Sequence, residues 1–355
     1  LLQVIVYWLM LLMPALFLFS PVRVTESHRR VLFFLVWITL VILIGLRNEV
    51  GGDWDRYLDS AYGIDKYQAF DIMHFFKGDI AYRAIHWVSV NYLYGIYSTN
   101  FICAVFFVSG LARFCRFMPI PWLALLISVP YLIIIVSMGY TRQSVAIGFL
   151  MWGLVDLIHG KKYKYYMFIA IGSLFHLSLL VMLFLAMPIS HGNFNKKMVI
   201  KWIVVLLLTS FFVYTALGEQ IDHMIFYYIT TPYHHSVGSV FRVGMGSLAG
   251  VIYLIYRDNF KSVYYDYKLW FVFSIISIIL LPAAFVLSTF VDRIAIYFIP
   301  LQLVVFSRVP TLIESVYYRT IFVIFVIFLY AFSLFVWLNF GLFSNHWLDY
   351  GSILF

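Results

Sequence analysis

Long runs of apolar residues follow one another along the chain and are separated by short polar stretches. A helix needs about 20 mostly apolar residues to cross the hydrocarbon core of a bilayer. The runs that approach or reach this length are residues 1–20, 31–46, 100–118, 120–137, 141–158, 198–217, 241–256, 268–289, 294–309 and 320–340. The pattern predicts an all-α polytopic membrane protein.

Two further apolar stretches, 80–97 and 164–189, are less regular. Whether these stretches cross the membrane depends on how the chain is oriented in it. Lysine and arginine concentrate in cytoplasmic loops and therefore indicate this orientation. The basic residues near the ends of the runs are Arg23, Arg29, Arg30, Arg113, Arg116, Lys161, Lys162, Lys164, Lys196, Lys197, Lys201, Arg257, Lys261, Lys268, Arg308 and Arg319. Placing them in the cytoplasm puts both chain ends outside, and each irregular stretch must then begin and end on one side.

We therefore expect 80–97 to lie at the outer surface or to dip into the bilayer. We expect 164–189 to be a broken, re-entrant hairpin bent near residues 172–176, which is tolerated where it lines a protein cavity. Two ordinary spans are the alternative. The whole chain is then one integral membrane domain, 1–355, of about 10–12 transmembrane or re-entrant helices. Its main outer-face loops are 47–80 and 218–242, and shorter outer segments are 137–143, 290–294 and 341–355.

Composition supports lipid as the solvent. Only 11% of the residues are charged and 64% are hydrophobic, whereas soluble domains average about 25% charged residues. The net charge of +8 fits cytoplasmic loops better than nucleic-acid binding, because no basic stripe is interleaved with polar residues. Cys103 and Cys115 lie in one apolar stretch and are interpreted as buried hydrophobic residues. The chain has no familiar metal or nucleotide motif, so no cofactor is expected.

Polar and ionisable residues close to the apolar runs are the candidate site, because such groups are costly at membrane depth. Those assigned to the outer face are Arg47, Asp53, Asp55, Arg56, Arg142, Gln143, Arg242, Asp292 and Arg293, with His176 in the predicted hairpin. The planar guanidinium of arginine matches phosphate oxygens and stays charged. Several arginines around an outer-leaflet cavity would suit a lipid-linked phosphate or diphosphate.

Structural alternatives remain open for several of these residues. Arg47 could extend to the interface with only its stem in lipid. His176 could be a packed histidine bonded to a carbonyl. Asp292 and Arg293 could form a structural ion pair.

Residues within four segments, 47–57, 141–146, 161–180 and 292–298, form short motifs in a fixed order. In this order they resemble motifs of the EpsG/Wzy-like exopolysaccharide polymerase family. Residues 47–57 resemble its opening signature of arginine, glycine, aspartate, an aromatic residue and tyrosine. Residues 141–146 resemble its arginine-glutamine motif before an apolar helix. Within 161–180, a basic loop followed by Phe175, His176 and Ser178 is similar to another motif, and 292–298 resembles a late arginine-tyrosine element. The motifs occur in order over residues 40–300. Gly52 stands where the family commonly has threonine.

The resemblance implies an architecture like that of the GT-C-like polysaccharide polymerases. It implies an enzyme that joins oligosaccharide repeat units carried on undecaprenyl diphosphate, at the outer (periplasmic) face of the bacterial cytoplasmic, or inner, membrane. Donor and acceptor are both lipid-linked, and the expected activity uses neither nucleotide sugar nor metal. A single displacement would invert the anomeric centre. A chain-length regulator and a flippase are implied partners, and nucleic acid is not.

The family signature and the chemistry suggest roles for the candidates. Arg142 is expected to stabilise charge on the leaving diphosphate, and Asp53 or His176 to act as the base for the acceptor hydroxyl. The expected substrate-binding residues are Arg47, Asp55, Arg56, Tyr57, Gln143, Arg242, Asp292 and Arg293. A membrane acyltransferase and a transporter of lipid-linked oligosaccharide are the alternative functions. The first would be expected to have a cytoplasmic donor site, and the second would favour two similar halves.

Overall fold

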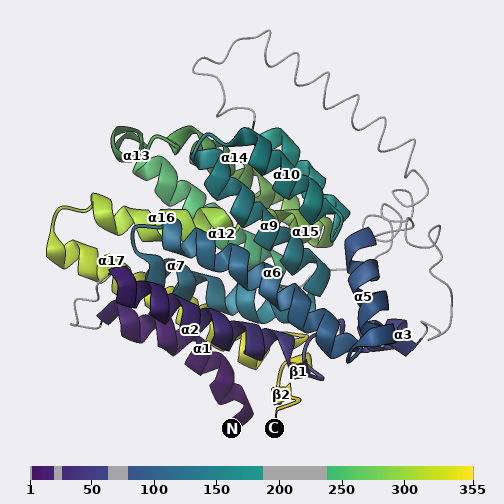
Figure 1. Ribbon diagram of the computed structural model, residues 1–355. Coiled ribbons are helices and arrows are strands. Elements are labelled where there is room, and N and C mark those ends of the chain that lie inside the picture. The colour runs from purple at the N-terminus through teal and green to yellow at the C-terminus, as the bar shows by residue number, and fades with distance from the viewer. Residues whose placement is uncertain (1, 20–25, 63–78, 187–237, 355) are drawn as a thin grey trace. The chain divides into compact units, whose positions relative to one another are not determined.

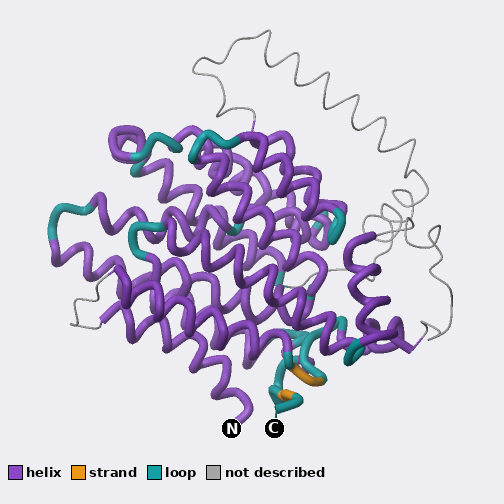
Figure 2. The backbone as a smooth tube through the Cα atoms, viewed as in Figure 1, coloured by secondary structure: helices purple, strands orange, loops and turns teal. Residues whose placement is uncertain are grey.

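The computed structural model describes residues 2–19, 26–62, 79–186 and 238–354 (Figures 1 and 2). The chain divides into two compact units, residues 1–180 with 306–355, and residues 181–305, and each is described by itself. The helices that lie within the first unit are α1 (Leu2–Phe19), α2 (Glu26–Gly45), α3 (Trp54–Tyr62), α5 (Ile80–Tyr92), α6 (Ile96–Phe117), α7 (Pro121–Ser128), the π-helix η1 (Val129–Val136), α8 (Ser137–Gly139), α9 (Thr141–Ile158), α10 (Lys162–Ser173), α17 (Val316–Phe340) and the 3₁₀ turn η5 (Ser344–His346).

The second unit contains α12 (Ser239–Ile255), α13 (Arg257–Val263), α14 (Tyr267–Ala284), α15 (Ser288–Ala295) and the 3₁₀ turn η4 (Ile296–Phe298). The 3₁₀ helix η2 (Leu177–Ala186) and α16 (Pro300–Leu312) each continue past a division between the units. The prediction of one integral membrane domain stays a prediction.

Helices long and apolar enough to span a membrane confirm the all-α polytopic class. The described residues contain five: Ser27–Gly45, Ile96–Phe117, Pro121–Gly139, Tyr267–Ala284 and Val316–Phe340. The number rises to seven if two bent pairs each form one span. In one pair α12 meets α13 at 72°, and in the other Ser288–Phe298 meets α16 at 47°. The predicted span 198–217 lies outside the described residues.

The two irregular stretches differ from ordinary spans. Helix α5 has 13 residues, or about 20 Å at 1.5 Å per residue, which is too short to cross about 30 Å of hydrocarbon. In the second stretch, α10 ends at Ser173 and η2 begins at Leu177, so the break lies where the sequence predicted it. Whether the chain then returns to the same face stays a prediction.

Several segments expected to be loops are helical instead. Helix α3 lies inside the predicted loop 47–80, and only Tyr140 separates α8 from α9. The loop predicted to extend to residue 242 has ended by Ser239, where α12 begins, so Arg242 belongs to the first turn of a helix. Asp292 and Arg293 lie within α15. These short helices put the candidate side chains on rigid backbone.

Two glycines bring α6 and α9 into close contact in the first unit (Figure 1). A Cβ on Gly110 would come within 2.1 Å of the Gly148 carbonyl oxygen, and one on Gly148 within 2.8 Å of the Phe107 Cα. Small residues of this kind let helix backbones approach within a membrane protein. The contact fixes α9, and with it Arg142, against α6.

A proline explains the wide turn in the central helix of this unit. Pro130 has no N–H and its ring clashes with the preceding turn, and the helix is a π-helix over Val129–Val136. A π-helix replaces i→i−4 bonds with i→i−5 bonds. The Ile134 carbonyl within it accepts a 2.9 Å hydrogen bond from the buried Trp347 indole.

The C-terminal segment holds the loop that follows α2. Strand β1 (Arg47–Asn48) pairs antiparallel with β2 (Gly351–Ser352), with Arg47 opposite Ser352. The Gly51 N–H donates to the His346 carbonyl at 2.8 Å, and the Tyr7 hydroxyl donates to the Trp347 carbonyl at 2.6 Å. Segments from both ends of the chain therefore support residues 47–53.

Candidate functional site

Three of the four sequence motifs pack together in the first unit. One buried hydrophobic cluster contains Trp54 and Tyr57 of the first motif, Val145 of the second and Phe175 of the third, together with Tyr82, Ile96, Cys103 and Phe149. The motifs are far apart in sequence, so their shared core is a property of the fold. The fourth motif lies in the second unit, which is described separately.

Arg142 lies in the first turn of α9 beside this cluster. Its Nη1 donates to Asp79 Oδ2 at 2.9 Å, and its Cζ lies 5.8 Å from the ring centroids of both Tyr57 and Tyr82. The two rings are themselves in contact, with centroids 5.6 Å apart. Cation–π contacts hold a guanidinium without neutralising it. Because 36% of its side chain is exposed, Arg142 is both anchored and accessible.

His176 approaches the same carboxylate oxygen of Asp79 as Arg142 does. Its Nδ1 is 3.7 Å from Asp79 Oδ2, and 29% of its side chain is exposed. Nδ1 is buried and has no hydrogen-bond partner, so this atom does not bond a carbonyl as the structural alternative proposed. Arg142 and His176 thus face one acidic oxygen from two motifs.

Arg47 is an internal brace and does not extend to the interface. It is 1% exposed, and its Nη1 and Nε donate to the carbonyls of Ile44 at 2.6 Å and Val50 at 3.1 Å. Nη2 donates to Thr141 Oγ1 at 2.9 Å and approaches Asn100 Oδ1 at 3.4 Å. Burial lowers the pKa of Arg47 to about 10, which leaves the side chain charged at pH 7. Its bond to Thr141 links the first motif to the residue before Arg142.

Asp53 lies next to Arg56, whereas Arg142 pairs with Asp79. Asp53 Oδ1 lies 3.5 Å from Arg56 Nη1, one turn along the chain, and the Arg56 side chain is 77% exposed. Exposed pairs of this kind contribute about 0–1 kcal/mol. Asp55 is also exposed and Gln143 is buried. The structure brings Tyr57, Arg142 and His176 together, and it leaves Asp53 at the rim with Arg56.

The remaining candidates form a separate cluster in the second unit. The buried Asp292 accepts two hydrogen bonds from Arg242, one of them from Nε to Oδ1 at 2.9 Å. Arg293 is partly buried in the last turn of α15. Arg242 also lines a small cavity with Ser277 and Gln302. Asp292 therefore forms an ion pair with Arg242, 50 residues away in the sequence.

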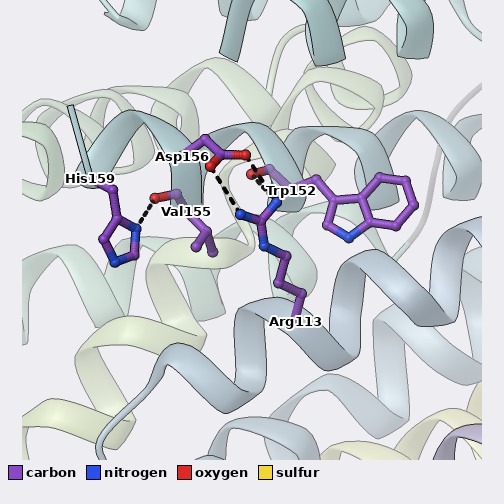
Figure 3. A network of polar contacts seen from close by, with 5 residues as sticks. All are labelled: Arg113, Trp152, Val155, Asp156 and His159. Atoms are coloured by element: carbon purple, nitrogen blue, oxygen red, sulfur yellow. Dashed lines mark hydrogen bonds and ion pairs between the residues drawn. The ribbon is translucent and has the colours of Figure 1, made fainter. Parts of the chain in front are cut away.

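A second ion pair in the first unit joins Arg113 of α6 to Asp156 near the C-terminal end of α9 (Figure 3). Both Nη atoms of Arg113 meet the two carboxylate oxygens of Asp156 at 3.0 Å, and Asp156 is 2% exposed. His159 lies one turn further along and its Nδ1 is 2.7 Å from the Val155 carbonyl oxygen. The positive charge of Arg113 is therefore compensated, and this residue gives little evidence for orientation.

The sequence did not single out Asp79 or a polar face of α5. Tyr82, His86 and Ser89 recur at helical spacing on this face and are all buried. Thr99 donates to the Gly95 carbonyl and therefore accepts from His86 Nδ1 at 3.1 Å, which leaves His86 Nε2 as a bare acceptor. Nε2 and the Tyr82 hydroxyl are buried without a hydrogen-bond partner, at a cost of about 1–3 kcal/mol each.

The 82, 86 and 89 spacing was a signal that could have been found in the sequence. Nothing in the sequence distinguished Asp79 from the other acidic residues of segment 47–80. Among the described residues, no group of three or more His, Cys, Asp or Glu side chains is placed to hold a metal ion.

The fold and this cluster define a multi-pass membrane protein with an arginine-centred polar site at the ends of its helices. The sequence model of the EpsG family matches residues 30–352, and the chain belongs to that family. It is a membrane protein of the polysaccharide-polymerase type. No curated protein and no solved structure matches the chain.

Proposed function

We propose that the chain is a glycosyltransferase that joins oligosaccharide repeat units en bloc while they are carried on undecaprenyl diphosphate. The observation that carries the proposal is the position of Arg142. Three motifs meet around this arginine, which is held by a carboxylate and two aromatic rings and remains 36% exposed. Such a guanidinium is suited to a diphosphate, because its charge is fixed in place before the substrate arrives.

The chemistry follows from the charges that change during transfer. The acceptor hydroxyl attacks the anomeric carbon of the growing glycan, and the bond from that carbon to the lipid diphosphate breaks. The electron pair leaves with the diphosphate, where Arg142 stabilises it. A base takes the hydroxyl proton. One displacement inverts the anomeric centre, and the proposed reaction uses neither nucleotide sugar nor metal.

The test is chain extension by the purified protein in detergent. The probe is undecaprenyl-diphosphate-linked oligosaccharide extracted from cells that lack this chain, with a fluorescent label on the glycan. We expect a ladder of products that grows by one repeat unit per step, with release of lipid diphosphate. Acylation without lengthening would instead identify an acyltransferase. Passage of intact lipid-linked oligosaccharide across proteoliposomes without lengthening would identify a transporter.

The proposed site faces the outside of the cytoplasmic membrane, and cysteine labelling tests this orientation. Asp59 on α3 and Lys161 before α10 are both exposed. In a background without Cys103 and Cys115, we expect an impermeant thiol reagent to label Asp59→Cys in intact cells and Lys161→Cys only after lysis. Labelling of Lys161→Cys in intact cells would favour two plain spans in place of the re-entrant hairpin.

A further inference from the structure

Asp79 occupies a capping position but does not cap its helix. It is the N-cap residue of α5, where aspartate usually accepts hydrogen bonds from the first backbone N–H groups. Its side chain makes no such bond. The carboxylate is turned instead towards Arg142 and His176, so it serves something other than the helix end.

A backbone bond from another motif replaces the missing cap. The N–H of Ala81, in the first turn of α5, donates to the Leu174 carbonyl at 2.9 Å. That carbonyl is available because α10 has ended at Ser173 and the next helix has not begun. The first turn of a helix leaves its N–H groups without partners and the last turn leaves its carbonyls. This bond gives a partner to one such N–H and to one such carbonyl. It also holds the break before His176 against the start of α5.

The carboxylate of Asp79 is therefore a largely buried acceptor that faces both Arg142 and His176. Asp79 Oδ2 accepts from Arg142 Nη1 at 2.9 Å and lies 3.7 Å from His176 Nδ1, and the Asp79 side chain is only 12% exposed. Burial raises the pKa of this carboxyl, but His176 and Arg142 outweigh burial and hold the pKa below its ordinary value. Asp79 is therefore ionised at neutral pH and acts only as an acceptor.

We propose that Asp79 is a positioning residue that turns His176 so that its Nε2 is the base for the acceptor hydroxyl. This inference rests on the proposed function and deepens it. A carboxylate opposite Nδ1 favours the tautomer with hydrogen on Nδ1, because a carboxylate has no proton to donate. Nε2 then carries the free lone pair. The Nδ1 distance is long for a hydrogen bond, and catalytic contacts often tighten only when substrate is bound.

The proton and electrons balance in this arrangement. The acceptor oxygen forms the new bond to the anomeric carbon, and its proton passes to His176 Nε2. The anomeric carbon–oxygen bond breaks with its electron pair on the diphosphate beside Arg142. His176 is now a cation between its substrate and Asp79, which offsets the new charge. The proton returns to water after the products leave.

The proposal is tested by a double-mutant cycle on Asp79→Asn and His176→Gln in the full-length protein. Asparagine caps a helix as well as aspartate and can still accept from Arg142, so it removes mainly the charge. With the fluorescent lipid-linked oligosaccharide as probe, Asp79→Asn is expected to lower kcat by about 100-fold, the lower end of what a general base contributes, while KM stays nearly unchanged. In the His176→Gln background, Asp79→Asn should have little further effect on kcat. Asp79→Glu should restore part of the rate, and Asp59→Asn, an exposed carboxylate on α3, is the matched control.

Equal losses from Asp79→Asn with and without His176 would overturn the proposal, because Asp79 would then act through Arg142 or through folding. A wild-type rate for Asp79→Asn would overturn it as well. Nitrogen NMR of labelled histidine gives a readout that does not need activity. The signal lost in His176→Gln, among 10 histidines, should report hydrogen on Nδ1 in the wild type and a different tautomer mixture in Asp79→Asn. A wild type that extends no glycan defeats the proposed function, whereas the tautomer still tests the pairing of Asp79 with His176.

Discussion

Arg142→Ala is expected to abolish polymer while single lipid-linked repeat units accumulate. The guanidinium stabilises the charge that develops on the leaving diphosphate, and loss of one preorganised donor to such a charge typically costs about 10²–10³ in rate. Arg142→Lys should recover only part of the rate, because an ammonium is a point charge without the planar fork. The measurement is the distribution of glycan lengths at equal protein level.

Arg319→Ala is the matched control for this prediction. Arg319 is exposed and donates to the Ile313 carbonyl, so its loss removes one positive charge of the same kind away from the site. Normal polymer from Arg142→Ala would remove Arg142 from the site. Equal loss of polymer in both variants would mean that overall charge matters and not this position.

The second large effect is expected from Gly51→Ala. Gly51 has a φ of +111°, which residues with a Cβ avoid, and the new Cβ would stand 2.1 Å from the Met138 carbonyl oxygen. Strained backbone of this kind costs about 1–3 kcal/mol before the clash is added. The loop must move, and it carries Trp54 and Tyr57 away from Arg142. We expect a lower apparent Tm in detergent and loss of chain extension.

Gly52 supplies the comparison within the same loop. A Cβ there meets only ring carbons of Trp347 at 3.6 Å, an ordinary contact. Gly52→Ala should therefore leave the apparent Tm and the rate near their wild-type values. If Gly51→Ala behaves like Gly52→Ala, the close approach to Met138 does not constrain the site.

Much of the fold was predictable because the long apolar runs in the sequence are a strong signal for helices. Within the described residues, the long apolar runs form helices. The break in 164–189 was predictable because glycine, serine and histidine interrupt the apolar run there. Helix α3 inside a polar segment was missed, because its alternating charges are also typical of a loop. The pattern of apolar residues is local. It therefore predicts where helices lie along the chain but not which helices pack against each other.

The site was predictable only where a motif marked it. Arg142 and His176 were found through the order of motifs, but their common partner Asp79 was not. Its role depends on the Ala81–Leu174 backbone bond, which joins residues 93 positions apart and has no signature in either segment. Asp156 was missed for the same reason, because Arg113 was interpreted as a loop charge until packing of α6 on α9 placed a carboxylate against it.

The pairing of β1 with β2 has a consequence for how the protein is made. Leu46 accepts hydrogen bonds from the Ser352 hydroxyl, 306 residues away, and from the Ile353 N–H. Every motif of the first unit leaves the ribosome and meets the bilayer long before these partners are translated. The loop with Gly51 and Tyr57 lacks this strand pairing during insertion of nearly all the helices, although its contacts with Thr141 and with the cluster around Phe175 can form earlier. Contacts of such long sequence separation form slowly. A chain that stops before β2 would therefore carry all the motifs, with this loop held by only part of its contacts.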